Sequence, residues 1–167
     1  RTFPVNGKFS KAQREIYNLV LSAQAAALNE IKPGNHWNDP HDAAVRVLTE
    51  GMVELGILKG NPEDLIKNKD YAKYYMHRTG HWLGMDVHDV GDYKLDGEWR
   101  MLEAGMVMTV EPGLYLSANS EGLSEQWRNI GVRIEDDVLV TKDGYDILSK
   151  DAPKTIDEIE ELMANAA

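Results

Sequence analysis

The chain contains no cysteine among its 167 residues. This excludes disulfide bonds, thiolate metal sites and a cysteine nucleophile, so any bound metal must be held by histidine, aspartate or glutamate. Positive charge is scarce as well, because 18 Lys and Arg stand against 28 Asp and Glu and leave a formal net charge of -10. A nucleic-acid partner requires a basic surface, so none is expected.

Long apolar runs are also missing. No stretch reaches the unbroken apolar length of a membrane span, and the first ten residues lack the apolar centre of a signal peptide. We therefore expect no membrane partner and a cytoplasmic location. With 43% hydrophobic residues, a chain of this length is expected to form one domain, or a piece of one, with a real core.

Two helices are predicted in the first part of the chain. The first spans about residues 10–31, where Ser10 and Gln13 form a capping-box pattern ahead of a periodic apolar stripe. The second runs over about residues 40–56, with Asp39 as its expected N-cap and a proline in its first turn.

The later part of the chain is rich in β-prone residues. After a polar connection at 61–70, strands are predicted at 107–110 and 131–140, and 145–148 returns as a hairpin partner across a Lys-Asp-Gly turn. A second capping-box pattern, Thr155 with the glutamate three positions later, opens a short C-terminal helix. Helices first and antiparallel strands later predict an α+β fold.

Three of the five histidines, His77, His81 and His88, lie in the segment HRTGHWLGMDVHDVG. The spacing of the first two is that of a zinc-binding H-E-x-x-H helix, but the glutamate is absent because residue 78 is arginine. Glycines at 80 and 84 also weaken a helix, so the segment is predicted as loop and strand in which the backbone passes close to a neighbour. The alternative is a set of partly buried histidines bonded to the backbone.

Two glutamates stand in apolar strand contexts. Glu111 ends the run MVMTVEPG, where a buried carboxylate is costly unless it is paired or binds metal. In VRIEDDV, strand alternation puts Val132 and Ile134 on one face and Arg133 and Glu135 on the other. The alternatives are a strand that ends in solvent and an exposed charge pair. Together with a histidine, the carboxylates suit manganese, cobalt or zinc.

Three longer blocks carry a resemblance to a known family. HWLGMDVHDVG, LEAGMVMTVEPGLYL and IGVRIEDDVLVT occur in this order in bacterial aminopeptidase P, the Xaa-Pro aminopeptidases, which are related to the prolidases. The resemblance implies the α+β pita-bread fold, incomplete at its N-terminal side. Residues 1–167 are then expected to be the C-terminal portion of a metallopeptidase catalytic domain.

The resemblance also implies roles for single residues. The implied metal ligands are His81, Glu111 and Glu135, of which the last bridges two ions. The residues implied to act on the substrate or the tetrahedral intermediate are His77, His88 and Arg133. The implied metal is Mn²⁺, two ions in the complete enzyme, with Zn²⁺ or Co²⁺ as alternatives. The implied substrate is a peptide with proline in its second position, and the complete enzyme is expected to be a homo-oligomer.

The chain departs from the family pattern in one respect. The family has two further aspartate ligands, in motifs of the form D-A-G and G-D-I-T-R-T-F, and neither aspartate occurs in residues 1–167, which open with Arg1-Thr2-Phe3. We therefore expect this chain by itself to be inactive. Two other readings stay open: a prolidase that cleaves only dipeptides, and a non-catalytic remnant or interaction module.

Overall fold

A computed structural model gives the structure of the chain, and it describes residues 1–165. Its helices and strands, in chain order, are α1 (Lys11–Asn29), α2 (Asp39–Glu54), α3 (Pro62–Asn68), β1 (Lys94–Leu95), β2 (Glu98–Trp99), β3 (Val107–Val110), β4 (Gly113–Leu116), β5 (Ile130–Arg133), β6 (Asp136–Val140), β7 (Tyr145–Ile147) and α4 (Ile156–Asn165). Short 3₁₀ turns lie at Asp70–Lys73 and Glu125–Trp127. Within the described range, no helix is long and apolar enough to cross a membrane.

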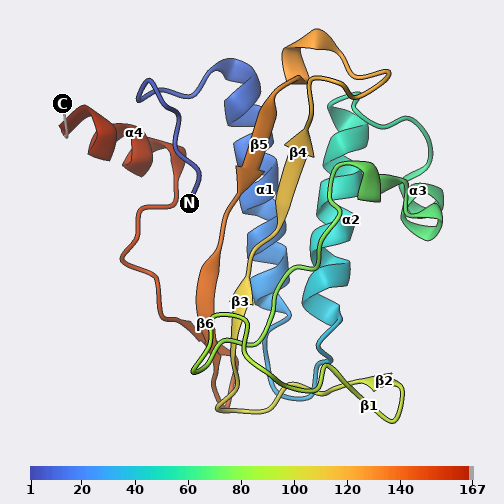
Figure 1. Cartoon of the computed structure of the whole chain (residues 1–167), viewed down its shortest axis with the longest axis vertical. Coiled ribbons are helices and arrows are strands. Elements are labelled where there is room, and N and C mark those ends of the chain that lie inside the picture. Colours follow the sequence, from blue (N-terminus) through green and yellow to red (C-terminus); the bar gives the residue numbers. More distant parts are fainter. Residues whose placement is uncertain (166–167) are drawn as a thin grey trace.

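The first layer consists of α1 and α2, which run side by side in opposite directions (Figure 1). The predicted capping box at the start of α1 is confirmed, because the Ser10 side chain accepts from the Gln13 amide and the Gln13 side chain accepts from the Ser10 amide. The helices approach closely at Gly51, where a Cβ atom would lie 2.2 Å from a methyl group of Leu19. A larger residue at position 51 would therefore force the Leu19 side chain to move.

The start of α2 differs from the prediction. Asp39 was expected to be the N-cap, but it is the first helical residue and Asn38 precedes it as the cap. The Asp39 carboxylate instead accepts a hydrogen bond from the His36 amide at 2.7 Å, outside the helix. The aspartate therefore fixes the entering loop and does not satisfy an amide of the first turn.

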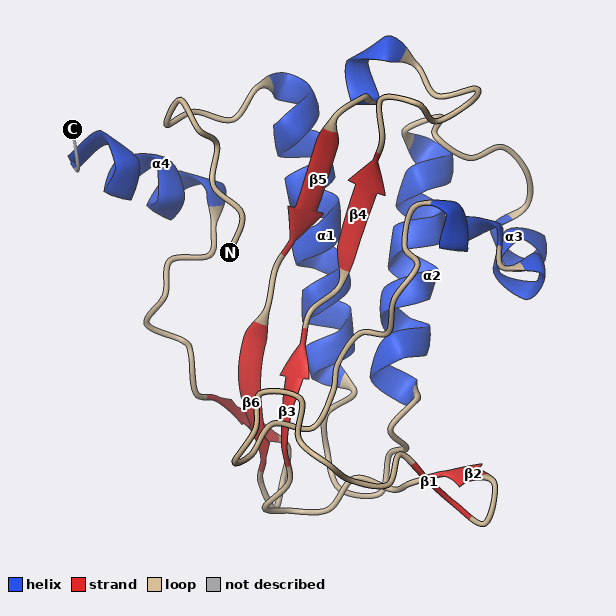
Figure 2. Ribbon diagram, in the orientation of Figure 1, coloured by secondary structure: helices blue, strands red, loops and turns tan. Residues whose placement is uncertain are grey.

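The second layer is a long antiparallel ribbon that crosses one face of α1 (Figures 1 and 2). One half of the ribbon is β3 paired with β6, and the other half is β4 paired with β5. The predicted single strand at 131–140 is wrong, because residues 134 and 135 lie between β5 and β6 outside either strand. The break faces Pro112, which has no N–H to donate to a partner strand.

Other elements complete the predicted α+β architecture. The β6–β7 hairpin and the second capping box, in which Thr155 and Glu158 bond each other's amides, are as predicted. Three elements were not predicted from the sequence: β4, the β1–β2 hairpin, and α3, which lies in the supposed polar connection. Asn61 caps α3 by accepting from the Glu63 amide at 2.9 Å, and Pro62 occupies its first turn.

A candidate metal centre at the ribbon break

Glu111 and Glu135 face each other across the break in the ribbon. Val110 pairs with Asp136 on one side of the break and Gly113 pairs with Arg133 on the other, so the same register runs through it. Continued across the gap, that register puts Glu111 opposite Glu135. Like charges at directly opposed positions repel. The sequence therefore brings two carboxylates together at the break in the strand pairing.

The two carboxylates are partly withdrawn from water. Glu111 is only 9% exposed, and Glu135 is half-buried. Burial raises the pKa of the Glu135 carboxyl, and the negative charges of Glu111 and Asp137 raise it further. The alternative in which Glu111 ends a strand in open solvent is wrong. An arrangement that strains the ionised form of a carboxylate is one that a cation would relieve.

His81 completes a group of three. Its Nε2 lies 3.3 Å from Oε1 of Glu111, and one ligand atom from each of His81, Glu111 and Glu135 lies within 4.8 Å of the others. Its Nδ1 lies 2.9 Å from the Trp82 carbonyl oxygen. Because a carbonyl only accepts, Nδ1 carries the proton and Nε2 keeps its lone pair for a ligand.

The loop that carries His81 is fixed alongside β3. The Thr109 amide donates to the His81 carbonyl at 3.0 Å, and Trp82 forms an isolated bridge with Met108. At Gly80 a Cβ atom would lie 2.1 Å from the Thr109 carbonyl oxygen. The segment is loop with a single bridge residue, and the predicted close approach of its backbone occurs at Gly80.

Thr109 connects the histidine to the glutamate. Its hydroxyl donates to Oε1 of Glu111 at 3.0 Å and accepts from the His81 amide at 3.1 Å. It is 1% exposed. Thr109 was not predicted from the sequence, although its position two before Glu111 in an extended segment places both side chains on one face. Bonds of this kind orient ligands and are part of a metal site.

Three side chains form a hydrogen-bonded line beside the carboxylates. Arg133 Nε donates to the Tyr115 hydroxyl at 2.8 Å, and that hydroxyl lies 2.7 Å from Nε2 of His77. An Arg133 nitrogen also lies 3.6 Å from Oε2 of Glu111. Arg133 therefore lies against Glu111, and the alternative of an exposed Arg133–Glu135 pair is not what the structure shows. Tyr115 was missed, since β4 was not foreseen.

Burial and hydrogen bonding shift the pKa values of these three side chains. Desolvation is the main cause that raises the pKa of Tyr115 and lowers the pKa of His77. For Arg133, burial acts to lower the pKa, but the bond to Tyr115 and the nearby acidic groups outweigh it and raise the pKa. His77 Nδ1 lies 2.7 Å from the Arg78 carbonyl, so this nitrogen holds the proton and Nε2 accepts from Tyr115.

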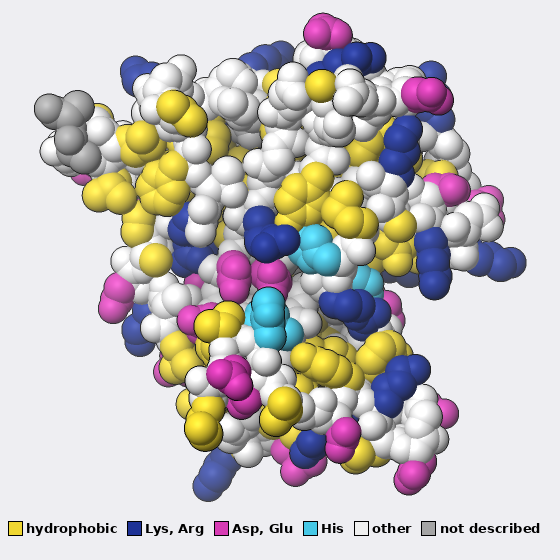
Figure 3. Space-filling model, viewed as in Figure 1, with side chains coloured by type: hydrophobic (Ala, Val, Ile, Leu, Met, Phe, Trp, Pro, Cys, Tyr) yellow, Lys and Arg dark blue, Asp and Glu magenta, His cyan; other side chains and the backbone are white. Residues whose placement is uncertain are grey.

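His88 lies on the open side of the centre. Its ring meets the His81 ring edge-on, with 4.3 Å between the ring centroids, and its side chain is exposed. Figure 3 shows histidine, acidic and basic side chains gathered around a hollow in this face of the molecule. The structure thus brings all six candidate residues to one region, the three candidate ligands at its centre and the other three around them.

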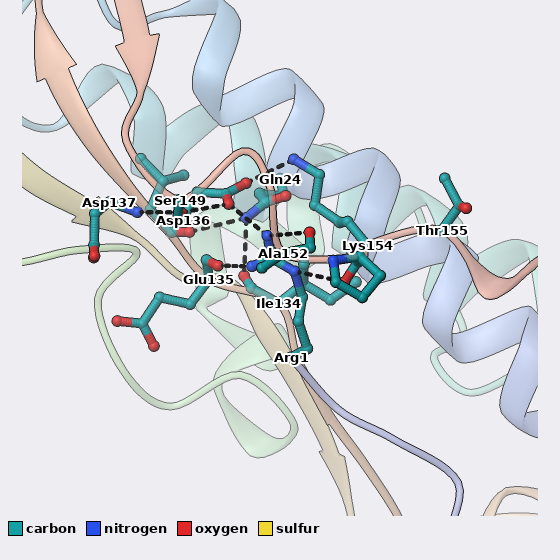
Figure 4. A network of polar contacts seen from close by, with 12 residues as sticks. Arg1, Gln24, Ile134, Glu135, Asp136, Asp137, Ser149, Ala152, Lys154 and Thr155 are labelled. Carbon is teal, nitrogen blue, oxygen red and sulfur yellow. Dashed lines mark hydrogen bonds and ion pairs between the residues drawn. The ribbon is translucent and has the colours of Figure 1, made fainter. Parts of the chain in front are cut away.

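A buried ion-pair network supports the centre from behind (Figure 4). The Asp136 side chain is fully buried and bonds Arg1 at 2.7 Å, Lys154 at 2.6 Å and Ser149 at 2.8 Å. Burial acts to raise the pKa of Asp136, but these three partners outweigh it and lower that pKa. Arg1 also donates to the carbonyl oxygen of Glu135. Asp136 and its three side-chain partners were not singled out from the sequence.

The donor set fits a divalent cation. An imidazole nitrogen with a free lone pair and two facing carboxylates are the ligands that manganese, zinc or cobalt accept. The hydrogen bonds to the far side of His81 and to Glu111 supply the orientation that such ligands need. The arrangement can therefore hold a cation beside an open hollow lined by groups that bind polar atoms.

Comparison with known proteins identifies related chains. The chain is 54% identical to the Xaa-Pro aminopeptidase of Haemophilus influenzae over 98% of its own length and 48% identical to that of Escherichia coli over 99%. It spans about 37% of the length of either relative. Among solved structures, an aminopeptidase PepP from Pseudomonas aeruginosa matches 99% of the chain with a TM-score of 0.98 and 57% identity, and the match covers 38% of that chain.

A second solved structure, the zinc-substituted aminopeptidase P of E. coli in complex with product, matches all of this chain and 38% of its own, with a TM-score of 0.95 and 48% identity. These matches confirm the predicted fold. The profile of metallopeptidase family M24 matches residues 1–142, a range that includes all three candidate ligands. The chain belongs to metallopeptidase family M24.

Proposed function

We propose that this chain serves metal-dependent Xaa-Pro aminopeptidase activity, the hydrolysis that releases an N-terminal residue ahead of proline. Residues 1–167 would form the C-terminal portion of the catalytic domain. The convergence of His81, Glu111 and Glu135 within 4.8 Å, from a loop and two strand ends, is the observation that carries the proposal. The names of the most similar relatives support the choice of reaction.

In this proposal His81, Glu111 and Glu135 would hold the metal. A bound divalent ion lowers the pKa of a water molecule and polarises the carbonyl that is attacked. The protein's part is to fix the ligands. Thr109 holds the Glu111 carboxylate, and the Trp82 carbonyl holds the His81 ring in the tautomer that leaves Nε2 free.

The remaining candidates act on the substrate. His77 and Arg133, joined through Tyr115, would bind the peptide beside the ribbon, and His88 would contact the oxygen that becomes negatively charged during attack. A proline nitrogen leaves poorly unless it is protonated, so an acid near the hollow is needed. Groups placed in this way act by orienting the scissile carbonyl and by stabilising charge in the transition state.

We propose Mn²⁺ as the metal, with Zn²⁺ or Co²⁺ as alternatives. The mixed nitrogen and oxygen donor set supports an ion of this group, and a zinc-substituted relative exists with product bound. Homo-oligomeric assembly and a cytoplasmic location stay predictions from the sequence.

A chimera tests the proposal. Residues 1–167 would replace the matching stretch of the E. coli enzyme, and the hydrolysis of an Ala-Pro-Ala tripeptide would be measured with manganese present. Activity that is lost with Glu135→Gln and kept with the exposed Glu125→Gln is the expected result. Activity on Ala-Pro alone would indicate a prolidase, and an inactive chimera that binds metal would indicate a non-catalytic remnant.

The same chimera separates ligands from substrate-binding residues. His77→Ala and His88→Ala are expected to lower turnover with little change in bound metal, because neither ring is a ligand in this proposal. Losing one donor to a developing negative charge typically costs about a hundredfold or more. Loss of metal in either variant would contradict the assignment of ligands.

A further inference from the structure

Gln24, on α1, lies directly behind the break in the ribbon. Its side chain is fully buried, and its amide nitrogen donates to the carbonyl oxygens of Val110 and Ile134, each at 3.2 Å. Both partners can only accept, so the amide must present its NH₂ group to them. Figure 4 shows the bond to Ile134, while the Glu135 side chain next to it points away from Gln24.

Pro112 explains why a donor from outside the ribbon is needed. The Ile134 amide donates to the Pro112 carbonyl at 3.3 Å across the break. In a hydrogen-bonded antiparallel pair the two residues exchange both N–H···O bonds. Proline has no N–H, so the return bond to the Ile134 carbonyl cannot form. The Gln24 amide takes the place of that missing donor.

The two carbonyls that Gln24 binds immediately precede the two carboxylate ligands, since Val110 is followed by Glu111 and Ile134 by Glu135. We propose that Gln24 is a positioning residue of the metal centre, whose amide replaces the proline N–H and holds Glu111 and Glu135 in facing positions. Where it concerns metal, the proposal rests on the proposed function. Its effect on the backbone does not depend on a metal.

The first test uses the metal-free chain. Gln24→Met keeps the size and the burial of the side chain but removes the donor. Hydrogen exchange of the Ile134 amide is then expected to accelerate about tenfold or more relative to the amides of β6, because the break opens locally. Gln24→Asn, which keeps an amide but is too short to reach both carbonyls, should give a smaller change in the same direction.

Thr49→Val is the matched control. Thr49 is also fully buried and polar, but its hydroxyl donates to the Val45 carbonyl within α2 at 2.7 Å, away from the break. This variant should leave the relative exchange rate of the Ile134 amide unchanged. An equal acceleration of all β6 amides by Gln24→Met would indicate general destabilisation and would overturn the proposal.

The second test is Mn²⁺ binding by calorimetry. Gln24→Met should weaken Mn²⁺ binding about 10- to 100-fold, the usual effect of removing a group that orients ligands, whereas Thr49→Val should not.

Adding Pro112→Ala to Gln24→Met returns an N–H to the strand pairing and should recover the exchange rate of the Ile134 amide and part of the affinity for Mn²⁺. Wild-type exchange and affinity in Gln24→Met would overturn the proposal. If the wild-type chain binds no Mn²⁺, the proposed function fails and the exchange test alone decides the role of Gln24.

Discussion

The hydroxyl group of Tyr115 lies 2.7 Å from Nε2 of His77. The same hydroxyl accepts a hydrogen bond from Nε of Arg133 at 2.8 Å, so the tyrosine donates one bond and accepts the other. The direction is set by His77 Nδ1, which is occupied by the Arg78 carbonyl and leaves Nε2 as an acceptor. Tyr115 therefore holds two candidate substrate-binding groups in one fixed arrangement.

Tyr115→Phe should disturb substrate binding and leave the metal in place. The ring remains, but His77 and Arg133 lose the group that joins them. A hydrogen bond to a charged group contributes about 1.5–3 kcal/mol, so kcat/KM of the chimera is expected to fall about tenfold or more. Tyr145→Phe in β7 is the control. Reduced metal content in Tyr115→Phe would contradict this separation of roles.

Thr109→Val should weaken metal binding without unfolding the chain. Valine has the same shape, but it can neither donate to the Glu111 carboxylate nor accept from the His81 amide. Loss of such an orienting group typically costs about 10- to 100-fold in metal affinity. Calorimetry with Mn²⁺ measures the change, and Thr141→Val in the turn after β6 serves as the control. Equal affinities in the two variants would show that Thr109 does not orient the ligand.

Asp136→Asn should destabilise the fold strongly. The carboxylate is fully buried between Arg1 and Lys154, and removing its charge leaves two cations facing a neutral group. Breaking a buried pair in this way typically costs about 3–5 kcal/mol. Urea unfolding at pH 7 measures the loss, with the exposed Asp143→Asn as the control. A loss no greater than that of the control would mean that the network contributes little.

His41 should make the stability of the fold sensitive to acid. Burial, with smaller effects of Arg78 and His77, lowers the pKa of this histidine from 6.5 to about 3, and its Nδ1 lies 2.9 Å from the Thr79 hydroxyl. Between these two pKa values the unfolded state binds a proton that the folded state does not. The free energy of unfolding should therefore fall as pH decreases from about 6.5 towards 3, by up to about 1.4 kcal/mol per pH unit.

The His41 prediction is tested by comparing how steeply the free energy of unfolding changes with pH in three chains. Urea unfolding between pH 7 and pH 4 would be measured for the wild type, for His41→Gln and for the exposed His36→Gln. Only His41→Gln should show a shallower dependence of stability on pH. If all three chains show the same slope, His41 is not buried in its neutral form.

Local patterns predicted much of the fold. The capping boxes at Ser10 and Thr155 fixed two helix starts, because they depend on residues only three positions apart. The helix α3 carried an available signal in Asn61-Pro62, which was overlooked within a polar stretch. The split between β5 and β6 was not foreseen, since it depends on Pro112, which lies between β3 and β4 on the opposite side of the ribbon.

The candidate site was also predicted only in part, because local sequence marks some of its residues and not others. Glu111 and Glu135 were visible as carboxylates in apolar strand contexts, and His81 through the clustering of histidines. All three also lie in family motifs, and the structure brings them together. Tyr115 and Gln24 have no sequence feature that indicates a role in the site, because tyrosines are common in strands and glutamines are common in helices. Their roles follow from pairing partners that are far away in the sequence.

The last prediction concerns the isolated chain. His81, Glu111 and Glu135 provide three ligands, and three protein ligands with water are enough to hold one ion. A second ion would share only Glu135, because the family's two aspartate ligands are not among residues 1–167. We therefore expect calorimetry to give one tightly bound Mn²⁺ per chain and no hydrolysis of Ala-Pro-Ala. Glu135→Gln should abolish that binding, since it removes one of the three ligands named above, whereas Glu125→Gln should leave it intact. Two tightly bound ions per chain, with turnover, would mean that other residues take the place of the aspartates.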